Sequence, residues 1–270
     1  MARYTQSVVT YLDILGFRQL VETATDPEEV AGRLSAFMRF SEPLQFDVDS
    51  RESGFTNFSD LVVRAVPVQR QRDSRGGVLL TEILDLVYAQ AKLAENRVLV
   101  RGAVTVGELF RRDHLIFGPG LVRAYELEST VALFPRIIFD PTIFAILTKG
   151  LELYGAGDPK EELGDIRNLL ALDSDGVWFL DYLRSIALSF GQDRTDYFRF
   201  LSHHKTMIVD QFAHFQTLSR VAAKFNWLAL YHNSVIRSLN NDEMRAVGLS
   251  ASALSIDLEG LPPIHGITGV

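Results

Sequence analysis

The stretch VVTYLDILGF, residues 8–17, decides how the first part of this chain is expected to fold. Its first five residues are mostly β-branched or apolar and predict a short strand, which Asp13 closes. Gly16 allows the backbone to turn tightly, and a helix is expected to begin directly after it. The amides of Leu15, Gly16 and Phe17 would then point to one place at the start of a helix, an arrangement that binds phosphate.

A second acidic residue, Asp60, follows in the turn of a predicted hairpin. Residues 55–66 contain two apolar stretches separated by the short polar residues Ser59 and Asp60, as hairpins do. Taken alone, an aspartate at such a place is most often a cap or turn residue. Together, Asp13 and Asp60 on adjacent strands would supply hard oxygen ligands for Mg²⁺ or Mn²⁺. The pair therefore predicts a site for a metal-bound triphosphate.

The remaining pattern predicts strands and helices in alternation as far as residue 185, and helices alone beyond it. Further helices are expected at 27–40, 78–96, 121–129 and 141–150, and further strands at 98–110, 115–117, 135–140, 169–172 and 177–180. Two long helices follow at about 196–218 and 218–240, and Pro262 and Pro263 indicate a surface tail at the end. We expect an α+β fold over residues 1–185, a helical extension over 186–250 and a tail over 251–270.

Composition and charge exclude several classes of function. The 270 residues, 47% of them apolar, suffice for a large buried core. The net charge of -7 argues against nonspecific nucleic-acid binding, which needs a basic surface. The sequence has no cysteine, which excludes disulfides and thiol nucleophiles, and it has no signal segment and no apolar run of about 18 residues. The expectation is an unprocessed cytoplasmic protein without nucleic-acid or membrane partners.

The order of these motifs resembles the class III nucleotidyl cyclases. In that family the first strand ends in Asp-Ile-x-Gly-Phe, as in Asp13–Phe17 here, and the next hairpin carries a second Asp, as in Ser59-Asp60. The segment Arg101–Gly107 is similar to the family's strand that enters a glycine turn, and Gly118–Ser129 is placed like the family's glycine and following helix. The resemblance covers roughly residues 5–185. It implies a ferredoxin-like class III cyclase catalytic domain, a βαββαβ core with an additional hairpin, followed by the helical extension.

The sequence departs from the purine-specific members of this family at three places. Thr56 stands where purine cyclases usually carry a Lys or Glu that reads the base. The family's transition-state Asn and Arg would fall on Val122 and Glu126, so neither is at its usual place. Arg123 lies one helical turn from Glu126 and could take over the role of the missing arginine.

Two further segments, Ala124–Glu128 and Phe134–Ile138, resemble a bacterial subgroup that includes the pyrimidine cyclases of Pycsar anti-phage defence. The resemblance implies conversion of UTP to 3',5'-cyclic UMP and pyrophosphate, producing a second messenger, in a head-to-tail homodimer with two Mn²⁺ or Mg²⁺ ions per active site. The metal ligands implied are Asp13, Asp60 and the carbonyl of Ile14, and the catalytic residues are Asp13, Asp60 and Arg123. The substrate-binding residues implied are Leu15, Gly16, Phe17, Thr56, Asn57, Phe58 and Arg101.

Three alternatives to a uridylate cyclase stay open. The substrate could be CTP, since nothing in the sequence separates it from UTP. It could be a purine nucleotide, which Thr56 disfavours. The chain could also be a degenerate cyclase-like module that binds a nucleotide or a partner without turnover, which Val122 and Glu126 favour.

Several other residues have a simpler structural interpretation. Arg101 is expected to brace the sheet through a carboxylate as readily as to bind phosphate, and Arg136 is expected at a surface or partner contact. Adjacent histidines such as His203 and His204 point to different faces of a helix, which disfavours a histidine metal site with His232. Helical spacing predicts core packing for Trp227, Leu230 and Tyr231, whereas Lys205 and Lys224 are expected to be solvated.

Overall fold

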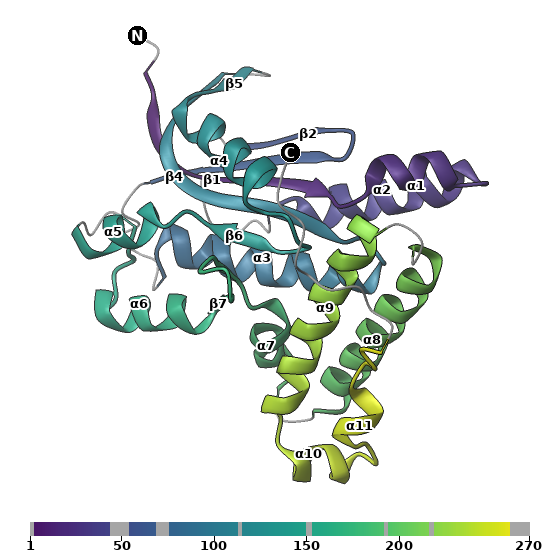
Figure 1. Ribbon diagram of the computed structural model, residues 1–270. Coiled ribbons are helices and arrows are strands. Elements are labelled where there is room, and N and C mark those ends of the chain that lie inside the picture. Colours follow the sequence, from purple (N-terminus) through teal and green to yellow (C-terminus); the bar gives the residue numbers. More distant parts are fainter. Residues whose placement is uncertain are drawn as a thin grey trace.

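The computed structural model describes residues 3–43, 54–68, 76–112, 115–149, 153–191, 194–215 and 219–259. It confirms an α+β fold built on one mixed sheet (Figure 1). The strands are β1 (Thr5–Ile14), β2 (Gly54–Phe58), β3 (Leu61–Pro67), β4 (Val100–Arg112), β5 (Leu115–Phe117), β6 (Ile137–Phe139), β7 (Leu170–Leu172) and β8 (Trp178–Leu180).

The sheet has the strand order β2-β3-β1-β4-β6-β8-β7, and β5 pairs with β4 outside this path. Adjacent strands among the first four in this order are antiparallel, whereas β6 runs parallel to β4. The hairpin predicted around Ser59 and Asp60 is confirmed as β2 and β3. Because β1 lies between β3 and β4, its end is flanked on both sides by other strands.

Every predicted helix is present, and several further helices were not predicted. They are α1 (Phe17–Thr23), α2 (Pro27–Ser41), α3 (Val78–Glu95), α4 (Pro119–Thr130), α5 (Thr142–Lys149), α6 (Pro159–Asn168), α7 (Tyr182–Ser185), α8 (Thr195–Phe215), α9 (Ser219–Ser238), α10 (Asn241–Ala246) and α11 (Ala251–Leu254), with a 3₁₀ helix at Ile186–Phe190. The short helices α7, α10 and α11 were not predicted individually, and the longer helix α6 was not predicted either. Its signal is the N-cap Asp158 followed by Pro159, the same pair of residue types that opens α2.

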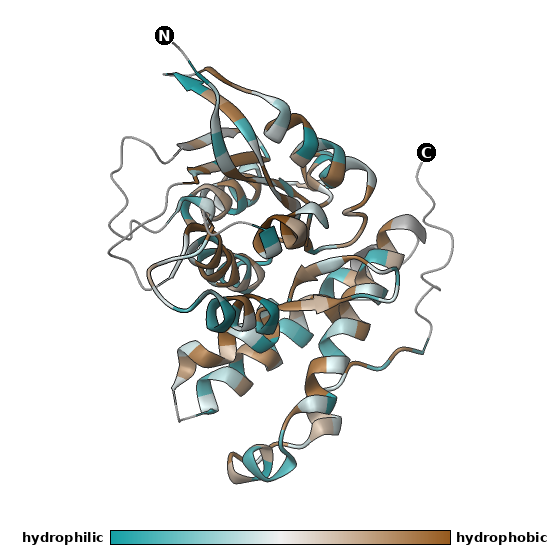
Figure 2. Cartoon of the chain, turned by 90° about the vertical axis from the view of Figure 1, so that its left-hand side faces the viewer, coloured by the Kyte–Doolittle hydropathy of each residue, from teal (hydrophilic) through white to brown (hydrophobic). Residues whose placement is uncertain are grey.

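The two faces of the sheet bury different residues because side chains alternate along a strand. Val8 and Leu12 of β1 face the large core that includes α3, whereas Val9 faces a smaller apolar cluster that includes Ala124 of α4. Figure 1 shows α4 on one side of the sheet and α2 and α3 on the other. In Figure 2 the helices in the lower half alternate between apolar and polar residues, as helices with one buried face do.

A buried ion network lies between the sheet and α3. Arg64 of β3 is fully buried, and its guanidinium donates to Glu82, at 2.9 Å, and to Asp85 on α3. The hydroxyl of Thr10, which lies opposite Arg64 in the sheet, donates to Glu82 at 2.7 Å. Ions so far from water are tolerated only while they neutralise each other.

The C-terminal helices share the core of the sheet. Trp227 of α9 stacks on Phe134 with ring centroids 5.5 Å apart, and its indole nitrogen donates to Asp173 at 2.6 Å. The packing role predicted for Trp227 and Tyr231 is confirmed, since both are buried. The expectation for Arg136 was wrong, because this residue is 1% exposed. Its guanidinium pairs with Asp173 and Asp175 and lies over the rings of Phe134, Phe179 and Trp227.

The first residues of the predicted tail pack against the C-terminal helices. Leu254 of α11 and Ile256 after it are buried against α8 and α9. The side chain of Asn233 donates to the Ile256 carbonyl and accepts from the Ile256 amide, both at 2.8 Å. Residues 251–258 therefore belong to the packed part of the chain. Pro262 and Pro263 lie outside the described residues.

A pair of histidines joins α8 to α9 inside the helical extension. His203 is exposed and His204 is buried, so the two face different directions, as predicted. The Nε2–H of His232 donates to the carbonyl of Leu254 at 3.0 Å, so its Nδ1 accepts from the Nδ1–H of His204 at 3.0 Å. The Nε2 of His204 then accepts from the hydroxyl of Tyr182 at 2.6 Å. Both rings are neutral in this chain of hydrogen bonds.

This histidine pair is expected to make the folded state less stable in mild acid. Burial lowers the pKa of His232 to about 4 and that of His204 well below its ordinary value. The unfolded histidines take up protons near pH 6.5, so the stabilisation is complete above that pH and is lost as the pH falls towards 4. For His232 alone the loss is about 3 kcal/mol.

Urea unfolding at several pH values measures this effect. The wild type should lose more stability between pH 7 and pH 5 than the His232→Gln variant, whose side chain does not titrate. His203→Gln, at the exposed neighbouring position, is the matched control and should follow the wild type. Parallel profiles for wild type and His232→Gln would contradict the assignment of the pH dependence to this pair.

Candidate functional site

The fold brings Asp13 and Asp60 to the same end of the sheet. Asp13 is the residue before the last of β1 and lies opposite Leu61 of β3 and Arg101 of β4. Asp60 comes directly before Leu61 in the hairpin turn, where Ser59 has a positive φ of 54°. The amide of Ile14 donates to the Asp60 carbonyl at 3.0 Å, which fixes the turn against the end of β1.

The Asp60 carboxylate lies close enough to that of Asp13 to act on it. The pKa of Asp13 is raised, first by burial and further by the nearby Asp60 carboxylate, while Arg101 opposes this change. A divalent cation between the two acids would relieve their repulsion, and carboxylate oxygens suit Mg²⁺ and Mn²⁺. In the described ranges, no three acidic, histidine or cysteine side chains converge as a complete metal site. The donor set therefore fits a cation that completes its coordination with backbone, water or phosphate oxygens, as Mg²⁺ commonly does.

Arg101 lies between Asp13 and a further acid, Glu128. Its Nε donates to the Oδ2 of Asp13 at 3.0 Å and lies 2.6 Å from the Oε1 of Glu128, in the last turn of α4. Glu128 is 3% exposed, and burial, with the Asp13 charge adding to it, raises its pKa to about 7 against the opposing effect of Arg101. Arg101 thus contacts a carboxylate, as the structural interpretation predicted, and that carboxylate is one of the two candidate metal ligands.

Glu128 was missed by the sequence analysis, although a signal for it exists. The helix α4 approaches β4 so closely at Gly120 that a Cβ on Gly107 would lie 2.8 Å from the Gly120 Cα. Ala124 and Glu128 follow Gly120 at intervals of four, which places all three on the face of α4 turned to the sheet. A glutamate on a buried helical face is a candidate for a paired or functional acid.

Lys224 of α9 joins the same group of charges. It was expected to be solvated, but it is half-buried, and burial together with the nearby Arg101 lowers its pKa, while Asp13 and Glu128 oppose this. Lys224 also lines a cavity of about 60 Å³ together with Ile14, Leu15 and Gly16. We call Asp13, Asp60, Arg101, Glu128 and Lys224 the charged cluster. It combines β1, the β2–β3 turn, β4, α4 and α9.

The turn after Asp13 differs in part from the predicted phosphate-binding turn. Gly16 has a φ of 77° and caps α1, so the predicted tight turn and helix start are confirmed. The amide of Leu15, however, donates to the carbonyl of Leu99 at 2.8 Å and is not free for phosphate. Leu15 and Phe17 are partly buried against the core.

The predicted base-reading residues lie on the edge strand β2. Thr56 lies opposite Val63 and Phe58 opposite Leu61, so by alternation both share the face of the sheet to which Asp13 belongs. Phe58 is 79% exposed. The backbone of Asn57 pairs with that of Val62, but its side chain lies outside the described part of the structure.

Arg123 is not placed with the acids of the charged cluster. Its Nε donates to the Oδ2 of Asp140 at 2.8 Å, and the hydroxyl of Thr105 donates to the same oxygen at 2.9 Å. Asp140 follows β6, is buried, and caps the start of α5 through the amide of Thr142. The helix α4 thus takes part in two separate ion pairs. Arg123 in its first half pairs with Asp140, whereas Glu128 in its last turn lies next to Arg101.

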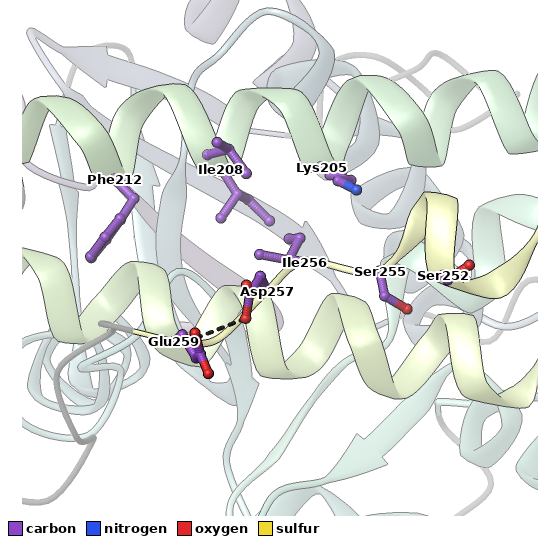
Figure 3. A pocket seen from close by; sticks show the side chains of 9 residues that line it. Lys205, Ile208, Phe212, Ser252, Ser255, Ile256, Asp257 and Glu259 are labelled. Carbon is purple, nitrogen blue, oxygen red and sulfur yellow. Dashed lines mark hydrogen bonds between the residues drawn. The ribbon is translucent and has the colours of Figure 1, made fainter.

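A larger cavity of about 560 Å³ lies elsewhere, between α8 and the segment after α11 (Figure 3). Its lining combines apolar side chains of α8 with polar groups of the following segment: Lys205, Ile208, Val209, Phe212, Ser252, Ser255, Ile256, Asp257 and Glu259. No residue of the charged cluster takes part in this lining. Lys205 donates to the carbonyl of Ala253 at 2.8 Å, so it connects α8 to α11.

The sequence matches no protein-family model, and no curated protein is significantly similar to it. Within the described ranges, no helix combines the length and the apolar character needed to cross a membrane. The charged cluster must therefore be interpreted from its own residues.

Proposed function

We propose that this protein is a nucleotidyl cyclase that converts a pyrimidine nucleoside triphosphate, UTP in the first place, to its 3',5'-cyclic monophosphate in anti-phage signalling. The observation that carries the proposal is the meeting of Asp13 and Asp60 beside Arg101. The connection β1-α1-α2-β2-β3-α3-β4 with the order β2-β3-β1-β4 also supports it, since this is the ferredoxin-like βαββαβ arrangement expected for a class III cyclase domain.

In this proposal four residues of the charged cluster, all except Glu128, have a chemical task. Asp13 and Asp60, with the carbonyl of Ile14, would hold two Mn²⁺ or Mg²⁺ ions, and these would supply positive charge for the triphosphate and favour loss of the ribose 3'-hydroxyl proton. The 3'-hydroxyl gives its proton to solvent, its oxygen bonds to the α-phosphorus, and the bond from the α-phosphorus to the leaving pyrophosphate oxygen breaks. Arg101 and Lys224 offset the negative charge of the phosphates at the same end of the sheet.

The choice of base rests on the edge strand β2. Thr56 stands where purine cyclases usually carry the Lys or Glu that reads the base, and the absence of that side chain supports a pyrimidine. Phe58 exposes its ring on the same face as Asp13 and could stack on the base. CTP is the nearest alternative, and it differs from UTP in the hydrogen-bonding groups of the base that Thr56 and Asn57 would meet.

The position of Arg123 supports a head-to-tail homodimer. In its own chain Arg123 pairs with Asp140 rather than with the acids, so a transition-state role needs the acids of a second chain. Phe58, Val122 and Tyr125 expose large apolar surfaces, and all three lie on the face of the sheet that α4 covers. An isologous contact through this face would repeat itself in both chains.

Replacing Tyr125 by glutamate is expected to disrupt this dimer. The variant places a charge in an apolar interface, and about 1000-fold weaker association is expected because the charge must be desolvated. Sedimentation velocity should give a dimer for the wild type and a monomer for Tyr125→Glu, with cyclic product lost in parallel. A monomeric wild type that still forms product would contradict the shared site.

Incubation with Mn²⁺ and each of the four nucleoside triphosphates tests the proposed reaction. We expect cyclic UMP and pyrophosphate in equal amounts, or cyclic CMP from CTP if the base preference is the alternative one. A cyclic purine nucleotide as the main product would refute the pyrimidine assignment.

A binding module without turnover is the second candidate, because Arg123 is already paired with Asp140 and the residues at Val122 and Glu126 do not supply the family's Asn and Arg. Its expected result is nucleotide binding, measured by calorimetry, with no cyclic product from any of the four nucleotides. A product from UTP or CTP that disappears in Asp60→Ala would exclude this candidate.

A further inference from the structure

Arg101 has two carboxylate partners but aligns its Nε–H with only one. The Nε–H donates to the Oδ2 of Asp13, while the Oε1 of Glu128 lies even closer, at 2.6 Å, without an aligned hydrogen bond. That oxygen is enclosed, and it accepts no hydrogen bond from the part of the chain that the structure describes. Buried acceptors normally have a donor, so this one is incompletely satisfied in the present arrangement.

The arrangement around Asp13 conflicts with cation binding. A divalent cation on the Asp13 carboxylate would lie next to the guanidinium that now occupies its Oδ2. Like charges so close repel each other strongly in a partly buried site. Arg101 must therefore leave Asp13, at least in part, before the cation can bind well.

We propose that Glu128 is a positioning residue that takes over Arg101 when a divalent cation binds to Asp13 and Asp60. The inference rests on the cation site of the proposed function and adds the residue that controls its affinity. Glu128 contacts no substrate in this proposal, because it acts only through Arg101. Its free Oε1 already lies at the contact distance from Nε, so a small rotation of the guanidinium would align the bond.

Lys224 supports this transfer of the Arg101 guanidinium from Asp13 to Glu128. It lines the cavity next to the end of β1 with Ile14 and Leu15, and its pKa responds to the charges of both Asp13 and Glu128, so a positive charge stays near these acids whichever of them Arg101 contacts. Lys224 comes from α9, and the transfer of Arg101 therefore depends on the position of the C-terminal helices. This gives the helical extension a role in the site that its packing alone does not require.

Binding of Mn²⁺ to the full-length protein without nucleotide tests the proposal, with the free ion measured by electron paramagnetic resonance. Glu128→Gln keeps the shape of the side chain but removes its charge, so Arg101 should stay on Asp13. We expect about 10-fold weaker Mn²⁺ binding, as is common when a partner of a metal-binding group is removed. Glu126→Gln, on the exposed side of the same helix, is the matched control and should bind like the wild type.

A double-mutant cycle with Arg101→Gln separates positioning from mere support of the fold. In the Arg101→Gln background no guanidinium occupies Asp13, so Glu128 has no group to draw away from it. Glu128→Gln should then no longer change Mn²⁺ binding. If Glu128→Gln binds Mn²⁺ like the wild type, or weakens binding equally in both backgrounds, the positioning role is wrong. A wild type that binds no Mn²⁺ at millimolar concentrations would overturn the cation site itself, and this inference with it.

Discussion

Asp60→Asn is expected to lower the rate of cyclic nucleotide formation by about 1000-fold or more, because the amide no longer supplies a negatively charged oxygen to the cations. The substitution is nearly isosteric, and it leaves the backbone carbonyl of Asp60 in place to accept from the amide of Ile14. The hairpin turn should therefore keep its conformation. Product formation from UTP, measured by chromatography with saturating Mn²⁺, gives the rate.

The control for this variant is a similar change at a distant surface position. Asp165 on α6 is exposed, so Asp165→Asn should form product like the wild type. Both variants should unfold at the same temperature as the wild type within a few degrees. If Asp60→Asn keeps most of the activity, the paired acids do not bind catalytic cations, whatever else the protein does.

The largest expected effect on stability comes from Arg64→Met. The variant takes the Arg64 guanidinium away from the buried carboxylates of Glu82 and Asp85, and breaking a buried ion pair usually costs about 3–5 kcal/mol. Urea unfolding followed by circular dichroism should show this decrease. Because folded proteins have stabilities of about 5–15 kcal/mol, a substantial fraction of the variant is expected to be unfolded or aggregated at physiological temperature.

Two further variants test the origin of this loss. Arg33→Met removes a cation that pairs with Glu29 on the surface of α2, and it should change stability by less than about 1 kcal/mol. The triple variant Arg64→Met, Glu82→Gln and Asp85→Asn removes all three charges together, and it should recover part of the lost stability. A loss in Arg64→Met no larger than that in Arg33→Met would show that the network is unimportant.

Local signals predicted most of the elements around the acids. The polar turn at Ser59 and Asp60 separates two apolar stretches, and Gly16 supplies the positive φ at the start of α1, so both could be read from short segments. The turn and the helix start are determined by residues that are adjacent in the sequence. The same is true of Asp158 and Pro159 before α6, although this pair was overlooked.

The remaining members of the site depend on contacts between distant segments. The burial of Arg136 requires Asp173, Asp175 and Trp227, which come later in the chain. The residues next to Arg136 in the sequence therefore predicted a surface position that the fold does not have. Lys224 has the sequence surroundings of an ordinary solvated lysine, and it becomes half-buried only because α9 lies beside the end of β1. No local pattern reports such a contact, because it arises only when the elements pack together.

The stacking of Trp227 on Phe134 limits how this protein can have changed during evolution. A protein shortened after Ser185 would expose the rings of Phe134 and Phe179 and leave Asp173 without the indole donor. Such a fragment would be expected to aggregate rather than to work as a smaller enzyme. The sheet and the two long helices should thus be gained and lost together in evolution, and gene fusions should join other domains outside this unit rather than within it.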